Sequence, residues 1–66
     1  MTLQLNGQPH PLEEETTLTA LLESIGLAGK PVVAELNREA IRPADFPTTP
    51  VKPGDQLEIV TLAAGG

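Results

Sequence analysis

The side chains of this chain offer few groups for catalysis. An enzyme of this size would need an acid, a base or a nucleophile converging in a pocket. The sequence has one histidine, His10, between Pro9 and Pro11, and it has no cysteine that a histidine could activate. Ser24 has no second group indicated nearby. We therefore expect that the chain is not an enzyme and that His10 is an exposed edge-strand residue.

Three consecutive glutamates, residues 13–15, are the densest group of candidate cation ligands. Hard cations draw their oxygen ligands from several positions of a folded loop, not from three successive side chains. The run precedes Thr16 and Thr17, and the start of a helix favours negative charge. We interpret it as a solvated helix start and expect no metal site. Other acidic residues are expected to face solvent or lie in turns: Glu35, Glu39, Asp45, Asp55 and Glu58.

The remaining chemical group is the carboxylate at the end of Ala63-Ala64-Gly65-Gly66. Residues without bulk cannot pack a core, so we expect residues 63–66 to form a flexible tail. Two glycines without Cβ atoms can pass through a narrow channel and let a partner approach the backbone closely. A frayed terminus would have the same composition, so the meaning of the tail depends on the domain that precedes it.

The composition describes one small acidic domain, which we place at residues 1–62. A chain of 66 residues buries only ~60% of the surface exposed on unfolding, and no cysteine is present to reinforce it. Four Lys and Arg against nine Asp and Glu leave no large basic face for nucleic acid. The net charge of −5 suits a partner with a basic docking site.

The sequence shows no targeting or membrane-spanning pattern. Its start, Met-Thr-Leu-Gln-Leu, lacks the basic region and apolar run of a signal peptide. No apolar stretch approaches the ~20 residues that cross a bilayer. We expect a cytoplasmic monomer without a bound cofactor.

The first twelve residues predict a β-hairpin. Residues 1–5 alternate between apolar and polar, which is typical of a half-buried strand. Asn6-Gly7 predicts a tight turn with positive φ at both positions. Pro9 and Pro11 cannot donate backbone hydrogen bonds, which places the strand at residues 8–12 near a sheet edge. The residues expected on the inner face of the first strand are Met1, Leu3 and Leu5.

A short helix follows, at about residues 17–25. Four apolar residues recur at helical spacing, Thr16 or Thr17 can cap the start, and Gly26 suits the end. The face they form consists of Leu18, Leu21, Leu22 and Ile25.

The second half predicts strands at residues 32–36 and 57–62, with a short return strand at 40–41. Residues 42–53 contain four prolines, too many for a long regular element, and Phe46 is expected to fill one end of the core. In the last strand, Leu57, Ile59 and Thr61 should face inward, and Glu58, Val60 and Leu62 outward.

The order of elements is hairpin, helix, strand, loop and strand. It predicts an α+β fold with a mixed sheet and one main helix packed across it. This is the β-grasp arrangement of ubiquitin, and the Gly-Gly end directly follows its last strand.

Three segments of the sequence resemble the ThiS family, the sulfur carriers of bacterial thiamin thiazole biosynthesis. They are Val-Ala-Glu-Leu-Asn at residues 33–37 followed by Ile41, Gly-Asp-Gln-Leu-Glu-Ile-Val at 54–60, and Gly65-Gly66. The resemblance covers the whole chain in length and element order. Many relatives have Val-Pro-Arg where this chain has Ile-Arg-Pro at 41–43, so no role is carried over to Arg42.

The resemblance implies that the chain is a co-substrate. An E1-like adenylyltransferase would use ATP to activate the Gly66 carboxylate, and a persulfide protein would supply sulfur to form a thiocarboxylate. Thiazole synthase would accept that sulfur. Gly65, Ala64 and Ala63 would thread the partner active site, and a docking patch beside the tail would consist of Val60, Leu62, Glu58 and Val33.

Three alternatives remain open. The chain could be the related small subunit of molybdopterin synthase or a tRNA-thiolation carrier. It could be a ubiquitin-like modifier that is conjugated to lysine. It could also be a passive interaction module, in which case removal of Gly66 would change nothing.

Overall fold

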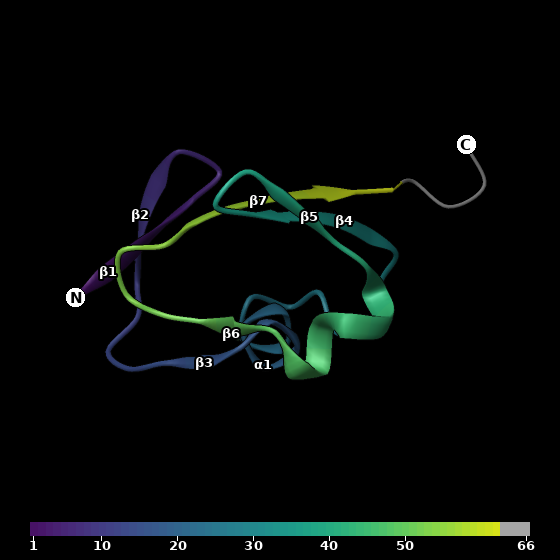
Figure 1. Cartoon of the computed structure of the whole chain (residues 1–66), viewed down its shortest axis with the longest axis horizontal. Coiled ribbons are helices and arrows are strands. Elements are labelled where there is room, and N and C mark those ends of the chain that lie inside the picture. The colour runs from purple at the N-terminus through teal and green to yellow at the C-terminus, as the bar shows by residue number, and fades with distance from the viewer. Residues whose placement is uncertain (63–66) are drawn as a thin grey trace.

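The structure is a computed structural model that describes residues 1–62 of the chain. Its main sheet has the strand order β2-β1-β7-β4-β5, with β1 and β7 parallel and the other neighbours antiparallel. Helix α1 and the 3₁₀ helix η1 lie below this sheet in Figure 1. The predicted α+β β-grasp fold is therefore confirmed. The elements are β1 (Thr2–Leu5), β2 (Gln8–Pro11), β3 (Thr16–Thr17), α1 (Leu18–Ser24), β4 (Val32–Leu36), β5 (Glu39–Ile41), η1 (Pro43–Thr48), β6 (Pro50–Val51) and β7 (Gln56–Thr61).

The N-terminal hairpin has the turn that its sequence predicts. Asn6 and Gly7 have φ angles of 51° and 78°, as a two-residue turn of this type requires. Strand β2 is an edge strand, as Pro9 and Pro11 indicated. The expectation that His10 is exposed was wrong. His10 pairs with the buried Leu3, so it lies on the core side of the sheet and is half-buried.

Helix α1 begins and ends where its capping residues predict. The Thr17 side chain accepts a hydrogen bond from the backbone N–H of Ala20 at 3.1 Å. At the other end, Gly26 has a φ of 83°, and the N–H of Leu27 reaches the carbonyl of Leu22 at 2.8 Å. The glutamates at 13–15 precede β3, and the first turn of α1 contains no acidic residue. Their interpretation as the start of the helix is corrected accordingly.

The proline-rich segment holds two short elements that sequence patterns did not reveal. Pro43 opens η1 at a position where its missing N–H costs nothing. Strand β6 pairs with β3 in a second, two-stranded sheet. The carbonyl of Thr49 then accepts the N–H of Leu18 at 2.9 Å. Both elements depend on contacts with distant segments. Phe46 is buried, as predicted.

Asp55 was expected to be a solvent-facing or turn residue, and only the second part is correct. Its exposed fraction is 8%. One carboxylate oxygen accepts the N–H of Lys52 at 2.9 Å, and the other accepts the side-chain amide of Asn37 at 3.3 Å. The carboxylate is buried because the turn before β7 uses it to satisfy these donors.

Asn6 extends the contact between β1 and β7 beyond the regular ladder. The strand pairing ends at Leu5 with Leu57. The Asn6 side chain then accepts the N–H of Ile59 at 2.7 Å and donates to the carbonyl of Ile59 at 3.2 Å. The amide group of Asn6 thus takes the place of a further strand residue and holds β7 in register.

We predict that Asn6→Gly lowers the free energy of unfolding by ~1–2 kcal/mol, because two hydrogen bonds to β7 are lost while the positive φ is kept without strain. Asn6→Ala should cost about 1 kcal/mol more, since alanine disfavours that backbone conformation. Urea denaturation of the two variants measures both effects. Equal stability of Asn6→Gly and the unmodified chain would contradict the role assigned to this side chain.

Candidate functional site

Strand β7 leads from the centre of the sheet to the C-terminal tail. In Figure 1 its arrow points away from β1 and β2. The last described residue, Leu62, donates its N–H to the carbonyl of Pro31 at 3.0 Å. Gly66, Gly65, Ala64 and Ala63, together with their predicted flexibility, lie outside the described residues. The site can therefore be described as the surface around the end of β7.

Three aliphatic side chains, which we name the apolar patch, lie on this surface. Val33, Val60 and Leu62 have exposed fractions of 51%, 59% and 50%. Val33 is the direct partner of Val60 in the β4–β7 ladder, and Leu62 follows on the same face of β7 by the period of two. The predicted exposure is thus confirmed. Among residues 1–62 the other large exposed apolar side chain is Met1, at 73%, so Met1 is not buried with Leu3 on the inner face as expected.

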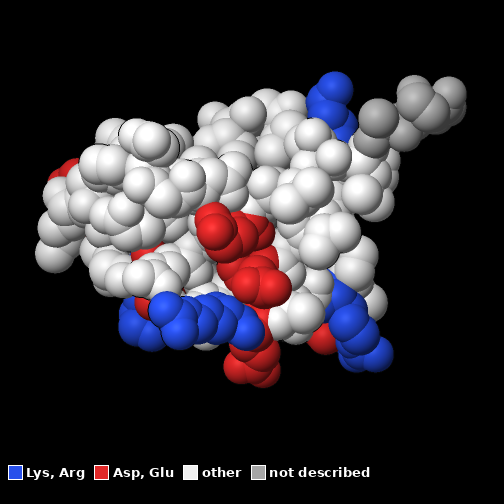
Figure 2. Space-filling view, turned by 90° about the horizontal axis from the view of Figure 1, so that it is seen from above, with Lys and Arg blue, Asp and Glu red and all other residues white. Residues whose placement is uncertain are grey.

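Acidic side chains lie beside the apolar patch on the same face of the sheet. Glu58 was predicted to face outward and does so. Its direct cross-strand partner is Glu35, which is also exposed. Figure 2 shows acidic side chains gathered near the middle of the face that the helices leave uncovered. Two like charges directly opposite each other destabilise an antiparallel pair. Sequence reasoning did not pair them because their contact depends on the register between β4 and β7.

Thr61 was expected to face the core, and the structure shows that it is exposed. Its partner in β4, Val32, is buried. The difference lies on the other side of β7, where β1 has already ended at Leu5. The final residues of β7 therefore have a neighbouring strand on one side only.

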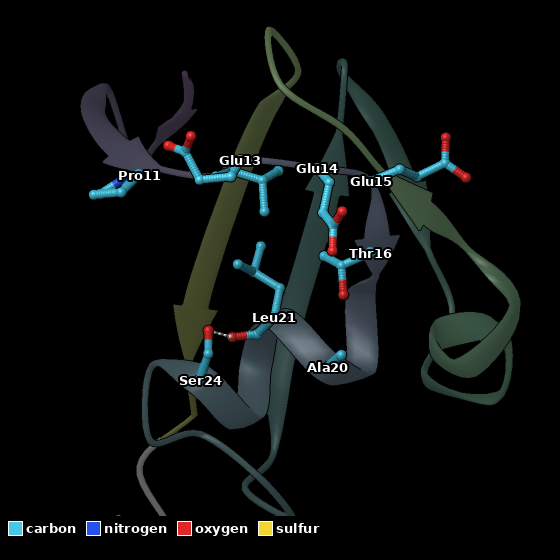
Figure 3. Close-up of a pocket in the computed structure, with 9 residues that line it drawn as sticks. Pro11, Glu13, Glu14, Glu15, Thr16, Ala20, Leu21 and Ser24 are labelled. Carbon is cyan, nitrogen blue, oxygen red and sulfur yellow. Dashed lines mark hydrogen bonds between the residues drawn. The ribbon is translucent and has the colours of Figure 1, made fainter.

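A hollow of about 380 Å³ lies between α1 and the segment that carries the three glutamates. Glu13 and Glu15 point in different directions, and Ser24 is turned towards its own helix (Figure 3). The Ser24 hydroxyl donates to the carbonyl of Leu21 at 2.7 Å. Within residues 1–62, no three His, Asp or Glu side chains gather as metal ligands. The hollow therefore presents no nucleophile paired with a base.

Two further observations concern the described part of the chain. None of its helices has the length and apolar character needed to span a membrane.

The Arg42 Nε donates to Asp45 across one turn of η1, at 3.1 Å, with both side chains substantially exposed. In the Ile-Arg-Pro segment at 41–43, which differs from the Val-Pro-Arg of many relatives, Arg42 precedes η1 and Pro43 is its first residue.

Comparison with known proteins agrees with this arrangement. A family model described as the ThiS family matches residues 3–66. The chain is 44% identical over 62 residues to the sulfur carrier protein ThiS of Thermus thermophilus, covering 94% of this chain and 95% of that protein. It is 35% identical to a thiazole synthase of Magnetococcus marinus, a match that covers the whole chain and 20% of that protein. The crystal structure of the thiamine biosynthesis protein (ThiS) from Geobacter metallireducens covers the whole of both chains, with a TM-score of 0.84 and 35% identity. The chain belongs to the ThiS family.

Proposed function

We propose that this chain, a sulfur carrier protein and not a catalyst, carries sulfur for thiamin biosynthesis as a thiocarboxylate on Gly66. The observation that carries the proposal is the family match, because it extends through residue 66 and so includes Gly65 and Gly66. The names of the relatives favour the thiamin acceptor over molybdopterin or tRNA thiolation.

The proposed cycle begins with activation of the carboxylate, which is ionised at neutral pH but is a poor acyl donor. An oxygen of the Gly66 carboxylate attacks the α-phosphorus of ATP, and pyrophosphate leaves. The outer sulfur of a protein persulfide then attacks the acyl carbon, and AMP leaves. A thiol cleaves the resulting acyl disulfide, which frees the thiocarboxylate and forms a new disulfide. The use of ATP supports a cytoplasmic location.

The groups that handle ATP belong to the partner, an E1-like adenylyltransferase. Phosphoryl chemistry needs a metal ion and cationic groups around the phosphates. The chain has four Lys and Arg residues in all, and it has no cysteine that could intercept the activated acyl group. Its own contribution is a backbone without bulk at Ala63, Ala64 and Gly65, which suits a narrow channel in the partner.

The apolar patch and Glu58 provide the proposed docking surface for these partners. Exposed aliphatic side chains that lie together favour a protein contact, and the acidic pair beside them favours a basic rim. Thiazole synthase is the proposed acceptor. The match of this whole chain to one fifth of a thiazole synthase supports the association, because a homologous domain there is part of the same polypeptide.

Intact-mass measurement after incubation with a cognate adenylyltransferase, ATP and a persulfide donor tests the proposal. The chain should gain the difference between sulfur and oxygen, roughly sixteen mass units, and deletion of Gly66 should abolish the gain. An unchanged mass in the presence of an active adenylyltransferase would contradict the proposal. Attachment of the chain to lysines of other proteins would instead identify a modifier.

We predict that Val60→Asp slows sulfur loading at subsaturating concentration at least about tenfold, because docking would bury an unpaired carboxylate in an apolar contact. Gln4→Asp is the matched control. It places the same charge on the same face, on β1, at a residue paired with Gln56 rather than with the apolar patch. Equal loss of loading rate in both variants would show that charge, not the patch, is responsible.

Glu58→Gln should have opposite effects on stability and on docking. Removal of one like charge from the pair with Glu35 should raise the free energy of unfolding by about a few tenths of a kcal/mol, and added salt should reduce this gain. Docking to a basic rim should weaken about two- to fivefold, mainly through slower association. Denaturation and stopped-flow binding measure the two effects. A variant that binds its partner faster than the unmodified chain would refute the acidic contact.

A further inference from the structure

The outer edge of β2 has no backbone donors to offer. The N–H of Leu12 reaches the carbonyl of Met1 at 3.0 Å, so the even-numbered residues of this strand direct their backbone groups towards β1. Pro9 and Pro11 occupy the alternate positions, whose nitrogen atoms point away from the sheet. Because proline lacks an N–H, another strand cannot form a regular ladder here.

The opposite edge of the main sheet is also protected. Strand β5 has only three residues, and its pairing with β4 uses the backbone groups of Glu39 and Ile41. The exposed side chains of Arg38 and Arg42 flank it. Short length and flanking charge are common means by which edge strands avoid unwanted pairing.

The main sheet has a third, short edge. It is formed by the end of β7, on the side where β1 has already ended. The backbone groups of Leu57 and Ile59 point towards β1, where Asn6 binds them, and that of Leu62 points towards β4. By alternation, the N–H and C=O of Thr61 point to the open side. Residues 60–62 themselves include no proline and no charged residue. Thr61 is exposed, which agrees with this geometry.

We infer that an extended segment of the sulfur-accepting partner adds to β7 at this open edge and pairs with the backbone of Thr61. The inference rests on the proposed function and specifies how that partner holds the chain. Strand addition to an exposed edge is a common mode of recognition, in which backbone hydrogen bonds give affinity. The edge is continuous with the apolar patch, since Val60 and Leu62 are the neighbours of Thr61.

A partner segment fits this edge better than a second copy of the chain does. Two copies would each bring a net charge of −5. Of their outer edge strands, β2 lacks outward backbone donors and β5 is short. Two copies could therefore pair only through the small open edge of β7 in each copy. A segment of a partner is not bound to this chain's net charge or to its edges, and the match of the whole chain to one fifth of a thiazole synthase supports that protein as the source of the segment. Pairing at Thr61 would fix the direction of β7 at the point where the chain leaves the sheet, which aligns it with the acceptor site.

Amide hydrogen exchange of the isotopically labelled full chain, free and saturated with thiazole synthase, tests the inference. The Thr61 N–H should exchange rapidly in the free chain and at least about tenfold more slowly in the complex. Thr61→Pro removes this donor without removing one from the β4 ladder, so its fold should be retained. It should bind at least about fivefold more weakly than Thr61→Val, the reference variant that keeps the N–H.

Unchanged exchange of the Thr61 N–H in the complex would overturn the inference, and so would equal affinity of the proline and valine variants. Dimerisation of the free chain that Thr61→Pro abolishes would also overturn it, because the edge would then belong to a second copy. Sulfur loading of the unmodified chain, measured by mass in the same samples, reports on the proposed function separately. Normal loading without Thr61 protection would leave that function standing and remove only the edge contact.

Discussion

The register of β7 against its two neighbours determines both the core and the functional surface of this protein. A shift of one residue would turn Glu58 and Val60 inward and Leu57 and Ile59 outward, because side chains alternate between the two faces of a strand. Two asparagines with positive φ oppose such a shift from opposite sides. Asn6 holds Ile59, and the Asn37 side chain accepts the N–H of Gln56 at 2.9 Å. The apolar patch is thus a consequence of the same contacts that bury the core.

This arrangement explains how a small chain with so few reactive side chains takes part in demanding chemistry. Its fold presents a surface and a strand that leads to the tail, while in the proposed cycle the partners activate the carboxylate and transfer the sulfur. The like-charged pair Glu35 and Glu58 is a cost to the isolated domain. A basic partner would offset that cost on docking, so the feature that weakens the free chain favours the complex.

Patterns within a few residues of each other predicted most of the fold. The turn at Asn6-Gly7, the cap at Thr17 and the alternation in β4 and β7 each depend on local backbone geometry. Features that depend on register or on distant contacts were missed. Asp55 is buried because Asn37, eighteen positions away, comes to lie beside it. At the site, the exposure of the apolar patch could be predicted, because side chains alternate between the two faces of β4 and β7. Predicting the pairing of Glu35 with Glu58 and the open edge at Thr61 would have required the order and register of the strands. Neither is specified by residues close together in the sequence.

Transfer of labelled sulfur from the isolated, loaded chain to the thiazole product would show directly whether this chain is the sulfur carrier. The chain would first be loaded with isotopically labelled sulfur, purified, and then mixed with thiazole synthase and its other substrates in a single turnover. We expect the label to appear in the thiazole and the chain to return to the mass of its free carboxylate form. Label that remains on the chain, or a thiazole that forms without label, would contradict the assignment of this chain as the sulfur carrier.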